Sequence, residues 1–385
     1  MSIRVHADVP FGNVCDVEIV ETRGGTEVRF AADPHGGPEC LWFCFRIERR
    51  GKKPPAGGKL RLVLKHSWSM LGVTIPFAVR PVVRRAGGDW ERLGEPAVEE
   101  LGDGRRLLSW TTKTPKTHLD VAFCYPYGPD EVDGLVADCG GVWRVDTIGV
   151  SQKARALTRL SNAYGEQGSE RPGIYVIARQ HSSETTGSWV LDGFLRHIAT
   201  LGDDAPMVWA APLSNIDGVI QGDYGKDNFP YDLNRAWGPA PMRHETLVFQ
   251  RDVGRWRKRC LPALGIDFHS PGGAERKGVY CFVPDPKLLP EMHRVTVGWA
   301  QAVSDALGET YASDERFARV ADYASRWDTP SFGRYFCETL GLPALCVETS
   351  YGMAHELVLT RDHYRDIGKR IAQGVLRHLK DAQGR

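Results

Sequence analysis

The chain has 385 residues, 42% of them hydrophobic and 25% charged, which is an ordinary composition for a globular protein with room for two cores. Lys and Arg number 49 against 48 Asp and Glu, so the basic excess typical of a nucleic-acid-binding protein is absent. No apolar run approaches the ~20 residues needed to cross a bilayer. Residues 1–8 show no apolar core of signal-peptide length. We therefore expect neither nucleic-acid nor membrane binding.

The cysteines favour a reducing compartment. There are nine, an odd number, and several lie inside apolar runs, as Cys44, Cys281 and Cys346 do. Buried thiols of this kind act as small hydrophobic residues and do not form a disulfide framework. No Cys-x-x-Cys pair is present, which argues against a cysteine zinc site. The sequence thus predicts a cytoplasmic protein.

Residues 1–128 form the first predicted domain. Short alternating or apolar runs are separated by Gly- and Pro-rich turns, and no long amphipathic helix is visible. The predicted strands are residues 16–21, 27–31, 41–47, 60–65 and 107–111. Short strands with such turns predict an all-β sandwich domain.

Residues 129–385 form the second predicted domain, in which strand-like and helical runs alternate. The predicted strands are residues 173–178, 207–213, 264–268, 280–283 and 344–347. The predicted helices are residues 186–199, 245–257, 289–307, 331–340 and 364–379. This alternation favours an α/β domain with a mixed central sheet flanked by helices.

Two histidines and a glutamate follow the predicted strands of the second domain. His181 and Glu184 come where the first strand turns into a helix, and His269 ends a later strand. Such positions lie at the crevice where open α/β sheets bind ligands. Two imidazoles and one carboxylate can hold zinc and leave its fourth position open for water. A His and a Glu three residues apart are also common at a solvated helix start. The prediction of a metal site therefore depends on the third residue, His269.

Glu348 supplies the remaining chemistry. It lies in the apolar run of residues 344–348, where burying a charge is costly unless the charge is paired or used. A glutamate that is not a ligand is what a zinc site needs to accept a proton from water. The alternative is a salt bridge at a strand end. Together with the metal group, Glu348 predicts a metal-dependent hydrolase.

The segment Asp232-Leu233-Asn234-Arg235 is a second candidate group. An amide beside a guanidinium can grip a carboxylate, because the guanidinium fork matches the two carboxylate oxygens. A nearby aspartate can accept the far N–H of a zinc-binding histidine. The alternative is a surface turn with a solvated arginine.

These motifs together resemble the zinc carboxypeptidases, and among them the cytosolic carboxypeptidase branch that trims glutamates. The resemblance spans nearly the whole chain. In the first domain it rests on Phe11-Gly12-Asn13, Leu41-Trp42-Phe43-Cys44-Phe45 and Phe123-Cys124-Tyr125-Pro126-Tyr127. In the second it rests on His181-Ser182-Ser183-Glu184-Thr185, Ser188-Trp189-Val190, Asn215-Ile216-Asp217-Gly218-Val219, Asp232-Leu233-Asn234-Arg235-Ala236-Trp237 and Glu348.

The resemblance implies roles for five of these residues. His181, Glu184 and His269 would hold one zinc ion per chain. Glu348 would activate the water at the zinc and pass its proton to the leaving amine. Asp232 would be the hydrogen-bond partner of His181.

The resemblance also implies a substrate-binding group. Asn234 and Arg235 would hold the terminal carboxylate of the substrate. Arg334 falls near the specificity position of the family, where an arginine would favour a terminal glutamate or aspartate. Its alternative is an exposed cation on the predicted helix 331–340. Tyr323 would correspond to the mobile tyrosine of the family.

The chain departs from the family at one catalytic position. The family has an arginine in a Gly-Asn-x-Arg stretch, where it stabilises the oxyanion of the reaction intermediate. Here the stretch is Gly222-Asp223-Tyr224-Gly225-Lys226, with Gly225 at the arginine position. Loss of one oxyanion donor commonly costs ~10²–10³ in rate. Either Lys226 replaces the donor or the substrate differs.

By this resemblance the chain would remove C-terminal, acidic residues from peptides or proteins, including glutamate-rich ends, and the first domain would form one wall of the groove. Two alternatives remain open. One is a zinc amidase or deacylase acting on a small acylated amino acid, prompted by Gly225. The other is a non-catalytic module that binds a carboxylate.

Overall fold

The computed structural model describes residues 2–51, 58–73, 75–226, 231–323, 325 and 327–383. Ten strands of the N-terminal part form two five-stranded sheets. One has the order β1 (Ser2–His6), β4 (Cys44–Arg50), β10 (His118–Ala122), β6 (Val82–Arg85) and β7 (Trp90–Arg92). The other has the order β2 (Cys15–Thr22), β3 (Gly25–Ala31), β5 (Lys59–Leu64), β9 (Arg106–Lys113) and β8 (Ala97–Glu100).

The two sheets share an apolar core. Residues that alternate along β5, namely Leu60, Leu62 and Leu64, are fully buried, as the period of a strand requires. From the other sheet, Phe45 approaches Phe30 of β3 with ring centroids 4.7 Å apart. The predicted strand 41–47 is shifted toward the C-terminus, since β4 begins at Cys44. Residues 41–43 are buried but precede the strand.

One mixed sheet organises the rest of the chain. Within the described residues its order is β11 (Arg144–Val150), β12 (Ala156–Ser161), β14 (Met207–Ala211), β13 (Pro172–Ala178), β15 (Leu261–His269), β18 (Ala344–Ala354), β16 (Lys277–Phe282) and β17 (Ala318–Arg319), with β19 (Leu357–Val358) beside β18. The neighbours from β14 to β18 pair in parallel, whereas β11, β12 and β16 pair antiparallel with their neighbours β12, β14 and β18. The predicted mixed α/β sheet is confirmed.

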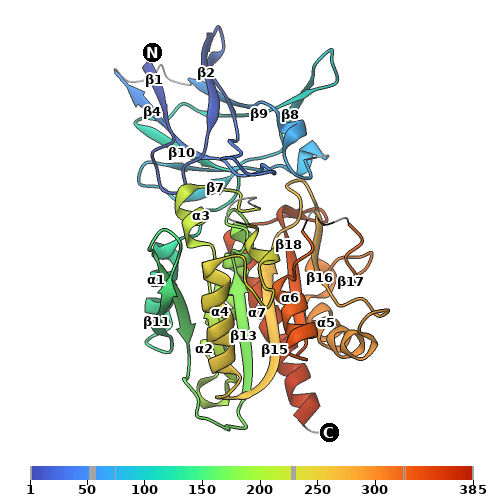
Figure 1. The fold of residues 1–385 in the computed structure, drawn as a ribbon. Helices are drawn as coiled ribbons and strands as arrows, with labels where there is room; N and C mark the ends of the chain where they lie inside the picture. Colours follow the sequence, from blue (N-terminus) through green and yellow to red (C-terminus); the bar gives the residue numbers. More distant parts are fainter. Residues whose placement is uncertain are drawn as a thin grey trace.

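Helices pack on both faces of this sheet (Figure 1). The helices are α1 (Pro129–Asp138), α2 (Thr185–Ala199), α3 (Ile216–Gln221), α4 (His244–Trp256), α5 (Pro290–Tyr311), α6 (Phe332–Arg334) and α7 (Arg361–Gln383). Alternate residues of β13 point to opposite faces: Ile174 and Val176 join the core that includes α2, α5 and α7, and Tyr175 and Ile177 join the core that includes α4 and α6. Among the described helices, none combines the length and apolar character needed to cross a membrane.

The predicted helix 331–340 is interrupted. It forms the single turn α6 and continues as a π-helical turn, η5 (Tyr335–Thr339). A π-helical segment is rare and occurs mostly as a single turn within a helix. The packing of Phe332 and Phe336, with ring centroids 4.3 Å apart, is consistent with this tight winding.

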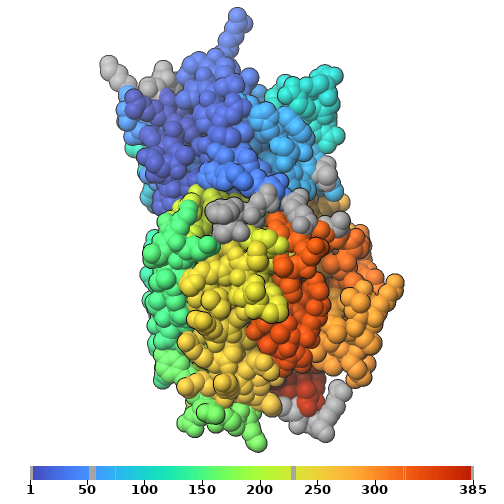
Figure 2. All heavy atoms as spheres, in the orientation of Figure 1, coloured from blue at the N-terminus to red at the C-terminus, as the bar shows by residue number. Residues whose placement is uncertain are grey.

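The N-terminal sheets and the rest of the chain meet across a broad junction (Figure 2). At one side of it Arg92 of β7 donates hydrogen bonds to Leu359 O at 2.6 Å and to Tyr364 Oη at 2.9 Å. Its guanidinium also lies 4.7 Å from the ring centre of Tyr125. A fully engaged arginine therefore ties β7 to the segment that leads into α7.

At another side of the junction two glycine-containing loops cross in direct contact. A Cβ on Gly72 would lie 2.5 Å from Gly272 Cα, closer than real Cβ atoms approach. Gly273 N donates to Leu71 O at 2.9 Å, and Ala274 N donates to Gly72 O at 3.3 Å. The loop that follows His269 is thus fastened to the N-terminal part by backbone hydrogen bonds.

Candidate metal centre

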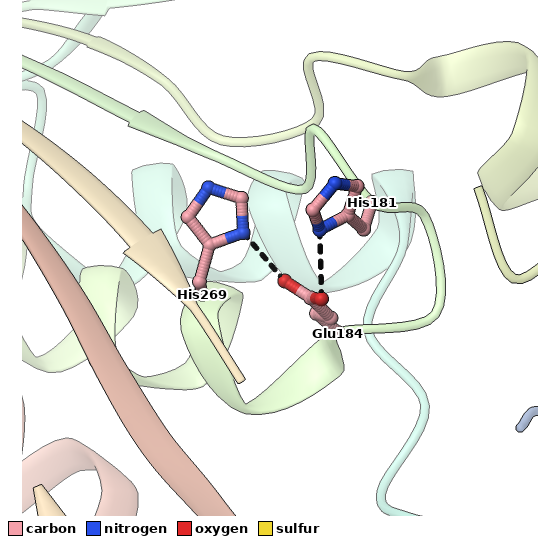
Figure 3. A group of neighbouring side chains, drawn as sticks. All are labelled: His181, Glu184 and His269. Carbon is pink, nitrogen blue, oxygen red and sulfur yellow. Dashed lines mark hydrogen bonds and ion pairs between the residues drawn. The ribbon is translucent and has the colours of Figure 1, made fainter. Parts of the chain in front are cut away.

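Three side chains meet at the carboxyl end of the central sheet. β13 and β15 are parallel neighbours, with Ala178 opposite Phe268, so the segments that follow them lie side by side. The turn between β13 and α2 carries His181 and Glu184, and His269 is the last residue of β15. Figure 3 shows the two imidazoles turned toward the carboxylate between them.

The turn that holds His181 depends on an arginine in an unusual conformation. Arg179 has φ 64°, in the left-handed region that costs a non-glycine residue free energy. Its Nε donates to Ser182 O at 2.7 Å and its Nη1 donates to Tyr127 O at 2.8 Å. Burial lowers the pKa of Arg179 to about 10, which still leaves it charged at neutral pH. Arg179 therefore fixes the loop on which two of the candidate ligands lie.

The donor atoms fit a divalent metal ion. His181 Nδ1 lies 2.8 Å from Glu184 Oε1, and His269 Nδ1 lies 2.6 Å from Glu184 Oε2 (Figure 3). Ligand atoms of the three residues all lie within 4.8 Å of one another, and all three residues are buried. Although burial alone would raise it, the two imidazoles lower the pKa of Glu184, so it is a carboxylate. Two nitrogens and one carboxylate oxygen are a zinc-type donor set.

Each histidine is backed by an aspartate on its far nitrogen. His181 Nε2 lies 3.2 Å from Asp232 Oδ1, as the sequence predicted. His269 Nε2 lies 2.8 Å from Asp267 Oδ2, a contact that the sequence analysis missed. The signal was available, because residues two apart on a strand point to the same face. Partners of this kind orient a ligating imidazole with its other nitrogen toward the metal.

Asn234 lies behind the metal group and not in the pocket lining. Its Nδ2 is 2.9 Å from His269 Nε2, and its Oδ1 accepts from Gln180 Nε2 and from Phe332 N, both at 3.1 Å. Gln180 also donates to Asp267 Oδ2 at 2.6 Å. The amide predicted to hold a substrate carboxylate is thus part of the network that supports His269.

A pocket of about 570 Å³ opens onto this group. Its lining consists of Glu39, Leu71, Gly72, Ile75, Glu184, Lys226, Asp232, Arg235, Ser270, Pro271, Gly272, Ala274, Glu275, Lys277, Tyr280, Phe282, Tyr323, Ser325, Trp327 and Glu348. Arg235 donates to Asn234 O at 2.8 Å and to Tyr323 Oη at 3.3 Å, so the predicted arginine and tyrosine lie together at the pocket wall.

Glu348 is brought to the metal group by strand register. β15 and β18 are parallel neighbours, and His269 is directly opposite Glu348. Burial raises the pKa of Glu348 to about 7, against the opposing effect of His269 and with a further increase from Glu184. One carboxylate oxygen, Oε2, is buried with no hydrogen-bond partner in the described structure. A glutamate with this pKa can both accept and release a proton near neutrality.

Gly225 and Lys226 pass beside the same group. Gly225 has φ +100°, and a Cβ there would lie 2.3 Å from Ser182 N and 3.0 Å from His181 Cα. No arginine fits this backbone position unless the turn moves. Lys226 does line the pocket, with its Nζ 5.6 Å from the ring centre of Tyr224.

Arg334 is not part of the group. It does not line the pocket, its side chain is 54% exposed, and it pairs with Glu338 one helical turn later, with Nε 2.8 Å from Oε1. The position corresponds to the alternative considered from the sequence, an exposed cation on a helix. The geometry gives no support to its predicted role in specificity, because the interrupted helix α6 turns the side chain away.

Sequence and structure comparisons are consistent with the geometry. No family model matches the chain. Cytosolic carboxypeptidase 2 of Xenopus tropicalis is 27% identical over 238 residues, which are 55% of this chain and 24% of the relative. Cytosolic carboxypeptidase 6 of Mus musculus is 32% identical over 140 residues, 33% of this chain and 26% of the relative. The chain spans about a quarter of the length of these relatives.

The fold has a solved counterpart over its whole length. A metallo-carboxypeptidase from Burkholderia cenocepacia superposes with a TM-score of 0.78 and 16% identity, covering 99% of this chain and 100% of the other. The chain thus resembles cytosolic carboxypeptidases over part of its sequence, and it shares the fold of a metallo-carboxypeptidase over nearly its whole length.

Proposed function

We propose that this chain is a zinc-dependent carboxypeptidase that hydrolyses the last peptide bond of a peptide or protein. The observation that carries the proposal is the convergence of His181, Glu184 and His269 in one group, with Glu348 opposite His269 on the next strand and both glutamates lining the same pocket. Three converging ligands and a separate base are the minimum for metal-assisted hydrolysis. The names of the relatives support a carboxypeptidase reaction.

Each residue has a defined task in this proposal. His181, Glu184 and His269 would hold the zinc, which when bound would act as a Lewis acid on the scissile carbonyl and lower the pKa of a water molecule. Glu348 takes a proton from the attacking water through its carboxylate and delivers it to the departing amine. Its raised pKa suits both steps, because donor and acceptor forms are then close in free energy.

Arg235 is the proposed anchor for the terminal carboxylate of the substrate, with Tyr323 beside it. The two hydrogen bonds described for Arg235 go to neutral oxygens, and Arg235 lines the pocket, so a substrate carboxylate that enters the pocket meets its guanidinium. Asn234 would assist only by exchanging its contact with His269. A terminal glutamate or aspartate is the residue we propose is removed, since Lys226 and Lys277 also line the pocket.

Three further proposals complete this interpretation. Residues 1–128 act as a β-sandwich domain that supplies one wall of the groove, and residues 129–385 act as the catalytic domain. Lys226 supplies the oxyanion donor that Gly225 cannot provide. The protein works in the cytoplasm, a proposal that the nine free cysteines support.

The decisive experiment incubates zinc-loaded protein with a defined library of C-terminal peptides and reads the products by mass spectrometry. We expect loss of terminal Glu or Asp, abolished by Glu348→Gln while one zinc per chain is retained. Glu356→Gln, which alters an exposed residue paired with Arg276, is the matched control. Equal trimming of Lys and Leu ends would remove the acidic specificity. A wild type inert on every substrate would favour a carboxylate-binding module.

A second candidate reaction is hydrolysis of a small N-acylated amino acid. The observation that favours it is the crowded Gly225 position, which excludes the arginine of the family. Measuring kcat/KM for an N-acyl glutamate and for a glutamate-ending peptide distinguishes the two reactions. The substrate with the larger kcat/KM identifies the preferred reaction.

A further inference from the structure

One charged residue of the pocket comes from the N-terminal part of the chain. Glu39 lies between β3 and β4, far in sequence from the metal group. Its Oε2 is 3.3 Å from Lys226 Nζ, and the two side chains are only 16% and 23% exposed. Both residues line the pocket that contains Glu184 and Glu348. The structure thus contains an ion pair between the two parts of the chain at the candidate site.

The residue before Lys226 lies close to the turn that carries His181. A Cβ on Gly225 would be 2.3 Å from Ser182 N and 3.0 Å from His181 Cα, so the chain enters Lys226 beside the metal group. The ring of Tyr224 lies 5.6 Å below the ammonium. What remains variable is the direction of the four-carbon side chain, which has high rotamer entropy.

Four carboxylates act electrostatically on the ammonium of Lys226. Burial lowers the pKa of Lys226, but Glu184, Glu39, Asp232 and Glu348 together raise it above its ordinary value. Lys226 lines the same pocket as Glu184 and Glu348, and its ammonium contacts Glu39. A divalent ion held by two neutral imidazoles and one carboxylate leaves a net positive charge, which repels the ammonium. Without a counter-charge on its other side, Lys226 would swing away from the metal group.

We propose that Glu39 is a positioning residue that holds the Lys226 ammonium at the metal group by balancing this repulsion. The inference rests on the proposed function. It means that the N-terminal part supplies Glu39, which positions the oxyanion donor Lys226 of the rest of the chain. The substrate carbonyl would then meet a lysine whose orientation is fixed before binding, which lowers the cost of reorganisation in the reaction.

The test is a double-mutant cycle on kcat and KM. Removing an oxyanion donor costs ~10²–10³ in rate, and we expect that loss for Lys226→Met. Glu39→Gln should lower kcat by roughly 5- to 50-fold with little change in KM, because a misplaced donor is still present. The double variant should equal Lys226→Met alone, because the proposal has Glu39 affect turnover through the lysine. Glu39→Asp should recover part of the loss.

A second readout is independent of turnover. The labelling rate of Lys226 by an amine-reactive reagent, followed by mass spectrometry, should rise in Glu39→Gln on the order of tenfold for each pKa unit lost. The matched control is Glu315→Gln. This substitution removes the carboxylate whose Oε2 lies 2.8 Å from Lys277 Nζ. Lys277 is another lysine of the pocket lining. This control should leave kcat and Lys226 labelling unchanged, and zinc content should be one per chain throughout.

The outcomes separate this inference from the proposed function. If the wild type is active and the decrease in kcat from Glu39→Gln adds in full to the decrease from Lys226→Met, the positioning role is overturned. The carboxypeptidase proposal then stays intact. Unchanged Lys226 labelling in Glu39→Gln would overturn it as well. If the wild type hydrolyses nothing, the proposed function and the kinetic role fall together, while faster labelling would still establish that Glu39 holds Lys226.

Discussion

At the scale of single residues, the candidate ligand His269 depends on a partner outside the pocket lining. His269 is held from behind by Asp267, whose Oδ2 also accepts from Gln180. Asp267 is almost completely buried, and its Oδ1 has no hydrogen-bond partner in the described structure. A buried carboxylate without a full set of donors is costly, so its place behind the imidazole indicates a role at the metal group.

Replacing Asp267 with Asn should weaken zinc binding by about 10- to 100-fold, because the imidazole loses the acceptor that orients it. Competition with a chromogenic chelator measures the affinity, and excess zinc should restore most of the turnover. Asp252→Asn is the matched control: it changes a buried aspartate of helix α4 that pairs with Arg159 of strand β12. Unaltered affinity in Asp267→Asn would contradict the prediction.

Glu348 should make the metal-free protein less stable as the pH rises. Its folded pKa of about 7 exceeds the ordinary 4.5, so between these values the folded state binds more protons and the free energy of unfolding falls with increasing pH. Metal-free Glu348→Gln should therefore exceed the wild type in stability at pH 8, by at most about 3 kcal/mol. Urea unfolding at pH 8 and pH 4.5 measures the gap. A gap that does not shrink at the lower pH would refute the assignment.

At the scale of elements, the long periodic segments could be predicted from the sequence. Helices α2, α4, α5 and α7 and the central strands β13 and β15 lie where apolar spacing placed them. Strands β11 and β12 were missed, since exposed and buried residues do not alternate cleanly along the edge strand β11. The split of residues 331–340 into α6 and a π-turn could not be predicted, because it follows from aromatic packing and not from local propensity.

The candidate site, like the fold, could be predicted from the sequence in part. His181, Glu184 and His269 lie at or just after the ends of β13 and β15, which the sequence showed, and Glu348 lies on the neighbouring strand β18 opposite His269. Arg334 was placed from an alignment, and a turn of α6 carries it to solvent. Glu39 carried no local signal, because its place in the pocket depends on how the two parts of the chain pack.

The loop after α3 should tolerate no side chain at Gly225. Gly225→Ala adds a Cβ that lies 2.3 Å from Ser182 N, and its φ of +100° is strained for alanine. We expect a loss of about 2 kcal/mol or more in unfolding free energy and weaker zinc binding, because the turn holding His181 must move. Gly51→Ala, also at φ +100° but with open space around it, isolates the backbone strain. Equal losses in the two variants would show that the crowding is unimportant.

At the scale of the whole molecule, the crossing of Gly72 and Gly272 couples the N-terminal sheets to the loop after His269. Gly72→Ala should reduce both stability and kcat/KM, since its Cβ would lie 2.5 Å from Gly272 Cα and push the pocket wall outward. Gly87→Ala has nearly the same φ, +71° against +65°, and nothing within 4 Å. It should show only the strain of about 1 kcal/mol and full activity. Thermal melting and peptide kinetics measure both effects.

The pairing of His269 with Glu348 on neighbouring parallel strands has a wider consequence. The separation of ligand and base is fixed by the strand spacing, a constant of sheet geometry of about 4.8 Å. The rest of the pocket lining, by contrast, includes residues of connecting segments, such as Lys226, Pro271, Gly272, Ala274 and Glu275. New substrate preferences can therefore evolve by remodelling these segments, while the reactive distance is inherited unchanged with the sheet.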